Sequence, residues 1–329
     1  MNNRTSVDWW AWRSRGSLEA HEKALGAVFA GSGYLPRLER RKGGYMGYEE
    51  SARVMVGDLD AGLIAWGGTN QRGWTYTSIH GQGCAWVDDW DRAQDAADAC
   101  GSYEPRRVDV ALDTWDGSSG FDATLQAYRA GGFSLSGRPP KCEPMKPERP
   151  EDSAIIRVGS RSGNKYLRGY EKGKQLLGPS ITAAMQNDPE GFEWSEWVMK
   201  TMPIPAPGGG LVAANVWDWW RLELELKPQT SALPEDVIDR RDQYFAGAYP
   251  YLGQVLGGVE AEALVMRRER APVLELAKAL EQVRAQYGDT LFSALTAYQG
   301  DIGAVWSKIC GRKHNRRLVE AGVLMVEHA

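Results

Sequence analysis

Three segments of this chain alternate apolar and charged residues, and this pattern constrains the fold more than any other feature. They read RVDVALD at 107–113, LRGYEK at 167–172 and RLELELK at 221–227. Residues two apart in a β-strand share a face, so each segment predicts a strand with one apolar and one polar face. The polar faces carry acidic side chains, basic side chains and a tyrosine. This set of reactive groups is larger than solubility requires. We therefore expect a sheet with a reaction surface on one side.

The composition is that of an ordinary soluble protein. The chain has 329 residues, enough for a large core and for one large domain or two. No apolar run approaches the roughly 18–20 residues of a membrane span, and the N-terminus lacks the apolar stretch of a secretory signal. The four cysteines include no CxxC pair, which predicts free thiols. We expect a cytoplasmic protein with no membrane contact.

All the predicted strands precede residue 230. Hydrophobic periodicity predicts strands at 6–12, 45–56, 62–67, 73–80, 107–113, 155–158, 166–172 and 221–227. It predicts helices at 18–29, 88–99, 121–130 and 189–199. The proline-rich stretch 134–152 is expected to be an extended loop. A Gly/Ser-rich hairpin turn is expected at 159–165.

Beyond residue 232 the pattern becomes helical, at 271–287 and 289–326. We predict an α+β fold with an antiparallel central sheet and flanking helices, followed by a helical C-terminal region. The boundary would divide the chain into an α+β region at 1–230 and a helical region at 231–329. VDW at 7–9 echoes VDV at 108–110, which is consistent with a duplicated strand–helix–strand unit.

Two basic clusters stand out on a chain whose net charge is −4. The net charge argues against a protein coated in nucleic acid. One cluster contains Arg157, Arg161, Lys165, Arg168, Lys172 and Lys174. The other contains Lys308, Arg312, Lys313, His314, Arg316 and Arg317. Local clusters of this kind suit a protein that grips phosphate at chosen places, although charge runs are also typical of solvated surface.

Several common catalytic motifs are absent from the sequence. There is no GxxxxGK[ST] phosphate loop, and the four histidines form no close pair. The carboxylates remain: Asp109 and Asp113, with Glu223 or Glu225, could hold a hard cation such as Mg²⁺ or Mn²⁺. Such a cation would polarise a phosphodiester. The alternative is a structural ion network with the neighbouring arginines.

Tyr170 is a candidate nucleophile. It lies between Arg168 and Lys172, and cations on the same face would stabilise a phenolate. A tyrosyl nucleophile attacking DNA forms a phosphotyrosine bond that conserves the energy for rejoining. Tyr166 lies four residues earlier on the same face, so strand parity does not exclude it. Ordinary packing is the alternative for either tyrosine.

Three runs of the sequence resemble the Rep_trans family of replication initiation factors, which includes the initiators of rolling-circle plasmids and filamentous phages. They are RVDVALDTWDG at 107–117, VGSRSGNKYLRGYEK at 158–172 and WRLELELK at 220–227. VDW at 7–9 and HGQGC at 80–84 look most like the phage branch. The resemblance spans about residues 5–230. It implies a catalytic nicking and joining domain at 1–230, and leaves a role in DNA binding or assembly for the helical region at 231–329. It implies a metal-dependent, sequence-specific nickase that cuts one strand at a replication origin. The enzyme would stay covalently on the 5′ end and leave a 3′-OH for a polymerase.

The resemblance also implies roles for particular residues. The family's Arg-x-Tyr-x-Lys strand places the nucleophile at Tyr170, between Arg168 and Lys172. Its acidic strands imply metal ligation by Asp109, Asp113 and Glu223 or Glu225. Glu171 departs from the Asn or Asp expected in plasmid relatives. The absence of a paired-histidine motif fits this family rather than the histidine-based rolling-circle enzymes.

The implied partner is a single-stranded or hairpin replication origin, in the cytoplasm of a bacterial host. No helicase motif is present, so a host helicase would unwind the DNA beside a polymerase; the protein would be a monomer or homodimer. The predicted DNA-binding residues are Arg157, Arg161, Lys165, Lys174, Arg312, Lys313, Arg316 and Arg317. Two rival functions remain: a metal nuclease that uses water, and a non-catalytic DNA-binding regulator.

Overall fold

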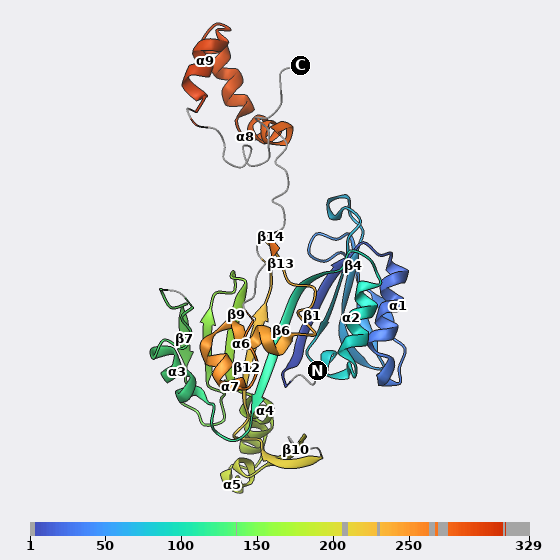
Figure 1. The fold of residues 1–329 in the computed structure, drawn as a ribbon, viewed down its shortest axis with the longest axis vertical. Helices are drawn as coiled ribbons and strands as arrows, with labels where there is room; N and C mark the ends of the chain where they lie inside the picture. Colours follow the sequence, from blue (N-terminus) through green and yellow to red (C-terminus); the bar gives the residue numbers. More distant parts are fainter. Residues whose placement is uncertain are drawn as a thin grey trace. The chain divides into compact units, whose positions relative to one another are not determined.

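The computed structural model describes residues 4–135, 137–205, 210–228, 231–262, 267–268, 276–311 and 313. The chain forms two compact units, Met1–Arg267 and Arg268–Ala329. The first contains a ten-stranded sheet with flanking helices, and helices follow in the second (Figure 1). The predicted α+β class with an antiparallel central sheet is confirmed.

The large sheet is antiparallel at every neighbouring pair. Its strand order is β2-β3-β4-β5-β1-β6-β12-β9-β8-β7. In that order the strands are Arg37–Arg40, Glu50–Val56, Leu59–Trp66, Thr75–His80, Ser6–Ser14, Glu104–Thr114, Trp220–Leu226, Lys165–Glu171, Ile155–Gly159 and Cys142–Met145.

The two halves of this sheet repeat one topology. β1 leads through α1 (Leu18–Val28) to edge strand β2, and the chain then returns strand by strand until β5 pairs with β1. β6 leads through α3 (Phe121–Arg129) to edge strand β7 and returns until β12 pairs with β6. The two starting strands, β1 and β6, lie side by side at the centre. This repeated order agrees with the duplicated unit that the sequence echo suggested.

Helices cover one face of the sheet, and we call the other the open face because no helix named below packs on it. The covering elements are α1, α2 (Trp90–Asp98), α3, α6 (Arg241–Ala248) and α7 (Pro250–Leu256). Val110 and Leu224 from the central strands join Leu25, Phe245 and Leu252 from the helices in one buried core. Burying a side chain of this size stabilises the fold by about 1.5–3 kcal/mol. The charged residues of the central strands therefore point to the open face.

Several local predictions differ from the structure. The strand predicted from residue 45 begins at Glu50, and the expected loop at 134–152 contains β7. β7 is an edge strand, a position that tolerates Pro144 because proline has no N–H for a ladder bond. A second hairpin was not predicted: β10 (Thr201–Pro205) pairs with β11 (Leu211–Asn215).

The sequence analysis assigned no element to the segment directly after β9. It forms helix α4 (Lys172–Asn187), whose Gly173, Gly178 and Pro179 hide the usual helical pattern. The helix predicted at 189–199 is shorter, α5 (Trp194–Val198). Ile181 of α4 is fully buried, so tertiary packing overrides the weak local preference.

The predicted boundary near residue 230 lies inside the first compact unit. α6 and α7 follow that position and bury Phe245 and Leu252 in the sheet core. Asp242 of α6 also accepts hydrogen bonds from the backbone N–H and hydroxyl of Thr5, at 2.9 and 2.6 Å. The chain therefore divides after Arg267, because residues 231–262 complete the core.

The remaining elements are short or belong to the second unit. β13 (Ser231–Ala232) and β14 (Arg267–Arg268) form a separate two-stranded sheet. The second unit contains α8 (Leu276–Ala297) and α9 (Ile302–Ile309). The helix predicted to continue to residue 326 lies partly outside the described residues. In the described ranges, no helix is long and apolar enough to cross a membrane.

His21 provides a pH-dependent contribution to stability. It is fully buried between Ser14 and Thr77, whose hydroxyl oxygens lie 2.8 Å from its two ring nitrogens. Burial lowers the pKa of His21 from 6.5 to about 4. Below pH 6.5 the unfolded chain therefore binds a proton that the folded chain does not. The contribution is present above pH 6.5 and is lost as the pH falls to about 4.

Because of His21, we expect the free energy of unfolding to fall by about 3 kcal/mol between pH 7 and pH 4. Urea unfolding of the wild type and of His21→Gln over this range measures it. The difference in unfolding free energy between the two proteins should shrink as the pH falls. Parallel pH profiles would contradict the assignment.

Candidate active site

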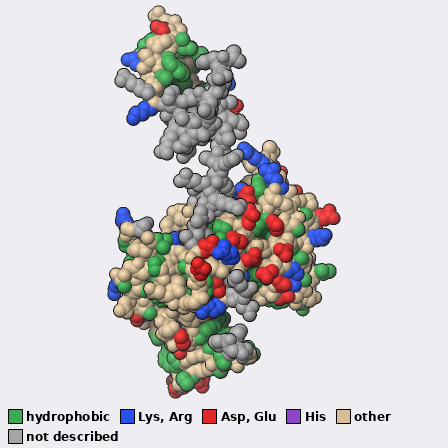
Figure 2. Space-filling model, in the orientation of Figure 1, with side chains coloured by type: hydrophobic (Ala, Val, Ile, Leu, Met, Phe, Trp, Pro, Cys, Tyr) green, Lys and Arg blue, Asp and Glu red, His purple; other side chains and the backbone are tan. Residues whose placement is uncertain are grey.

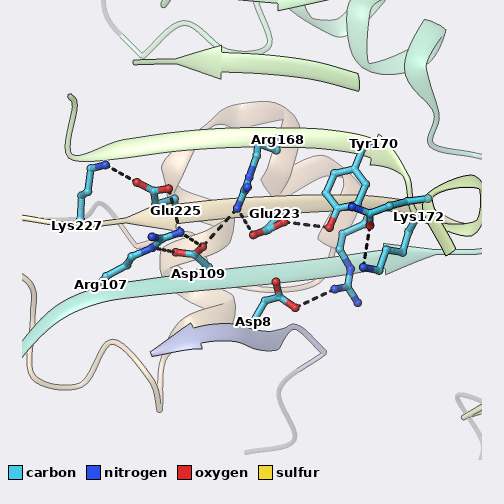
Figure 3. Close-up of polar contacts among 11 residues, drawn as sticks. Asp8, Arg107, Asp109, Arg168, Tyr170, Lys172, Glu223, Glu225 and Lys227 are labelled. Carbon is cyan, nitrogen blue, oxygen red and sulfur yellow. Dashed lines mark hydrogen bonds and ion pairs between the residues drawn. The ribbon is translucent and has the colours of Figure 1, made fainter. Parts of the chain in front are cut away.

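The three charged segments are neighbours in the sheet, in the order β6-β12-β9. Arg221 of β12 lies opposite Asp113 on one side and Tyr170 on the other. Glu223 lies opposite Arg168, and Glu225 lies opposite both Asp109 and Tyr166. The polar residues of the three strands therefore meet on the open face, as their alternation predicted (Figure 3).

Close packing explains the glycine inside the tyrosine strand. Leu167 and Gly169 of β9 point to the helix-covered face, while Arg168 and Tyr170 point to the open one. A Cβ at Gly169 would lie 2.8 Å from Cζ2 of Trp220 and 3.0 Å from Cγ2 of Ile156. Only glycine lets the indole pack this closely under the strand. The Arg-Gly-Tyr order thus combines two polar side chains on one face with a tight core contact on the other.

Tyr170 donates a hydrogen bond to a carboxylate. Its hydroxyl lies 3.0 Å from Oε2 of Glu223, and only 8% of the residue is exposed. Burial, and then the negative charge of Glu223, raise the pKa of Tyr170 well above its ordinary value. The expectation of a phenolate stabilised by cations is therefore wrong for this arrangement. Tyr170 is a protonated phenol whose proton faces an acceptor.

The two cations beside Tyr170 are engaged elsewhere. Arg168 pairs with the other oxygen of Glu223 and lies 3.5 Å from Oδ2 of Asp109. Lys172 is the first residue of α4 rather than part of the strand, and its Nζ donates to Gln175 at 2.9 Å. That Nζ lies 5.8 Å from the centre of the Tyr170 ring, and burial lowers the pKa of Lys172.

A second group surrounds Asp109, whose side chain is only 1% exposed. Arg107 donates to both of its oxygens, at 2.8 and 2.7 Å, and also lies 3.2 Å from Glu225. Lys227 pairs with the other oxygen of Glu225. Burial raises the pKa of Asp109 to about 7, against the lowering effect of Arg107. Asp109 is thus a buried carboxyl group held on both oxygens by Arg107.

Asp8 is a site residue that sequence reasoning missed. Arg221 donates to both oxygens of Asp113, each at 2.7 Å, and to Oδ1 of Asp8 at 3.0 Å. A β-bulge between Val7 and Trp9 lies at Asp8, and bulges re-aim side chains in this way. The available signal was the VDW–VDV echo, which aligns Asp8 with Asp109 in the repeated halves.

The four predicted metal ligands each accept a hydrogen bond or ion pair from an arginine: Asp109, Asp113, Glu223 and Glu225. Within the described part of the chain, no three Asp, Glu, His or Cys side chains are grouped as a metal site. These contacts form the structural ion network that we named from the sequence as the alternative to a metal site. The donors still suit Mg²⁺ or Mn²⁺ in chemistry, because carboxylate oxygens are the ligands these cations prefer. Arg168 stands between Asp109 and Glu223, where a cation would neutralise the same two charges.

The predicted DNA-binding residues separate into different places. Arg157 lies opposite Arg168 on the open face, and Arg161 stands 5.6 Å from the ring centre of Tyr166. A surface pocket beside them is lined by Lys141, Glu143, Arg157, Gly159, Ser160, Arg161 and Tyr166. Tyr166 shares the open face with Tyr170, as strand parity required.

Two further predicted DNA contacts of the first unit, Lys165 and Lys174, are engaged with other groups of the chain. Lys165 points to the helix side, where it donates to the carbonyl of Ala248, and burial lowers its pKa to about 8. Lys174 pairs with Glu171 at 3.0 Å. Lys313 is exposed in the second unit. The remaining predicted contacts lie outside the described residues: Arg312, Arg316 and Arg317.

Comparison with known proteins gives distant similarity to solved structures only. No protein-family model matches the chain, and no curated protein matches it. Among solved structures, the chain is similar to a rolling circle replication initiator protein from Geobacillus stearothermophilus. The identity is 17%, the match covers 68% of this chain and 74% of the other, and the TM-score is 0.44. A similarity this distant leaves the function to be inferred from the chain's own residues.

Proposed function

We propose that this protein is a rolling-circle replication initiator that nicks and rejoins one DNA strand through Tyr170. The observation that carries the proposal is the 3.0 Å hydrogen bond from the Tyr170 hydroxyl to Glu223. A nucleophile within hydrogen-bond reach of a base, which is itself held by a third group, is the arrangement of an activated nucleophile. Arg168 is that third group. The motif resemblance at 158–172 selects the same tyrosine.

The proposed reaction exchanges one phosphate ester for another. Oη of Tyr170 attacks the phosphorus of the scissile phosphodiester, and the Oη–P bond forms as the P–O3′ bond breaks. Glu223 takes the phenolic proton, and the departing O3′ takes a proton from water. The 5′ end of the cut strand is then a phosphotyrosine ester, and the other end is a free 3′-OH. Attack by a 3′-OH on this ester rejoins the strand.

Arginines on the open face bind the phosphate in this proposal. Arg168 is within reach of Glu223 and Asp109, and a guanidinium can donate two parallel bonds to a phosphate. Its Nε is buried with no acceptor among the described residues, so one donor is unused. Arg157 and Arg161 would hold neighbouring phosphates. A Mg²⁺ or Mn²⁺ ion on Asp109 and Glu223 would polarise the phosphodiester.

The proposal is tested with labelled single-stranded and hairpin oligonucleotides that tile the DNA encoding and flanking this chain, incubated with MgCl₂ or MnCl₂. We expect a denaturation-resistant adduct that carries the 3′ label, together with a free fragment that carries the 5′ label and ends in a 3′-OH. Cleavage without an adduct would identify a metal nuclease that uses water. Binding without cleavage in either metal would identify a regulator, and either result would overturn the proposal.

A further inference from the structure

The open face of the first half of the sheet carries aromatic rings and arginines that the proposed chemistry does not use. Trp9 of β1 lies opposite Asp109 of β6 and His80 of β5. Arg13 of β1 lies opposite Tyr76 of β5. We call the set the aromatic–arginine surface; its members are Trp9, Trp74, Tyr76, Arg13, Arg15 and Arg107.

Each tryptophan of this surface is paired with guanidinium groups. The guanidinium carbon of Arg107 lies 4.4 Å from the centre of the Trp9 ring. Those of Arg13 and Arg15 lie 4.4 and 5.0 Å from the centre of the Trp74 ring. Aromatic rings that stack on bases, beside cations that follow the phosphates, are the elements with which proteins bind single-stranded nucleic acid.

The surface is continuous with the candidate active site. Arg107 contacts both Trp9 and Asp109, and Asp109 lies beside Arg168. From β9, which carries Tyr170, to β1 there are three inter-strand steps, or about 14 Å. A DNA strand whose phosphate lies at Tyr170 would therefore reach Trp9 within a few nucleotides.

The opposite side of the sheet is acidic. Asp91 and Asp95 of α2 lie near Asp236 and Asp239 in the chain before α6. Burial is the largest cause that raises the pKa of Asp239, and the negative charges of the other three raise it further. Figure 2 shows Asp and Glu side chains gathered over these elements. This side repels a polyanion. The charge distribution of the first unit therefore favours nucleic acid on the open face.

We propose that the aromatic–arginine surface binds single-stranded DNA next to the nucleophile by stacking unpaired bases on Trp74 and Trp9. This inference deepens the proposed function and rests on it for the direction of the strand. Double-stranded DNA does not stack on these tryptophans, because paired bases do not present their flat faces to a side chain. The surface thus favours an origin in its unpaired form.

Fluorescence anisotropy with a fluorescein-labelled dT15 strand and a duplex of equal length, in EDTA, tests the proposal on the full chain. We expect Trp74→Ala to weaken dT15 binding about 10-fold or more, and Trp9→Ala similarly, with duplex binding unchanged. Trp74→Phe should stay within about threefold of wild type because phenylalanine still stacks. The matched control is Trp86→Ala: this tryptophan is 38% exposed and pairs with Tyr34 beyond the end of α1.

The outcomes separate this inference from the proposed function. Wild-type dT15 affinity in both alanine variants, or an equal loss for duplex and dT15, would overturn the inference even if the wild type forms the adduct. Selective loss for dT15 would support the surface even in a protein that forms no adduct. Urea unfolding of each variant shows whether it is folded, and Arg15→Gln, at an exposed position, supplies a second test. It should weaken dT15 binding and reduce, by about one, the slope of log binding constant against log salt concentration.

Discussion

Replacing Tyr170 with phenylalanine is expected to abolish the covalent protein–DNA adduct, by at least about 1,000-fold in its rate of formation. The substitution removes the one oxygen that would attack phosphorus and keeps the ring that fills the site. Tyr166→Phe is the matched control, because Tyr166 occupies the same strand and face and is buried to a similar extent. Gel electrophoresis of labelled oligonucleotide after denaturation measures both.

The Tyr170→Phe protein should remain folded. Loss of one hydrogen bond costs about 1–2 kcal/mol, and Glu223 keeps its ion pair with Arg168. Urea unfolding checks this point. An adduct that persists in Tyr170→Phe and disappears in Tyr166→Phe would move the nucleophile four residues along the strand. Loss in both variants with normal stability would indicate that the sheet face, rather than one hydroxyl, had been damaged.

Glu223→Gln is expected to slow adduct formation by about 100- to 10,000-fold, the range associated with loss of a general base. A tyrosine is protonated at neutral pH, and burial and the charge of Glu223 raise the pKa of Tyr170 further, so attack requires an acceptor for the proton. A glutamine amide keeps the shape of the side chain but is a much weaker base. Single-turnover kinetics with a cleavable oligonucleotide measure the effect.

Glu225→Gln is the control for this prediction. Glu225 lies two residues along the same strand, is 6% exposed, and pairs with Arg107 and Lys227 rather than with the tyrosine. Its replacement perturbs the ion network but leaves the hydrogen bond of Tyr170 in place. Equal rates in Glu223→Gln and wild type, or equal losses in the two variants, would rule out a specific base at Glu223.

The alternation of apolar and polar residues correctly predicted which side chains of the central strands share a face. This works because facing depends only on the two-residue period within each strand. Arg107, Asp109, Glu223 and Tyr170 are therefore on the polar face that their parity required. The same rule failed at Lys172. β9 ends at Glu171, and the next residue starts a helix that glycine and proline conceal in the sequence.

The sequence alone therefore determined which side chains share a face, the antiparallel α+β class and the two candidate tyrosines. Tertiary structure alone decided which strands are neighbours, because β9 and β12 pair across an insertion of two helices and a hairpin and no local pattern specifies that pairing. It also brought Asp8 to Arg221 through a bulge and turned Lys165 to the helix side. Above all, it placed a carboxylate rather than a free cation at the hydroxyl of Tyr170, because Arg168 pairs with Glu223 and Lys172 donates to Gln175. The resting tyrosine is consequently a proton donor.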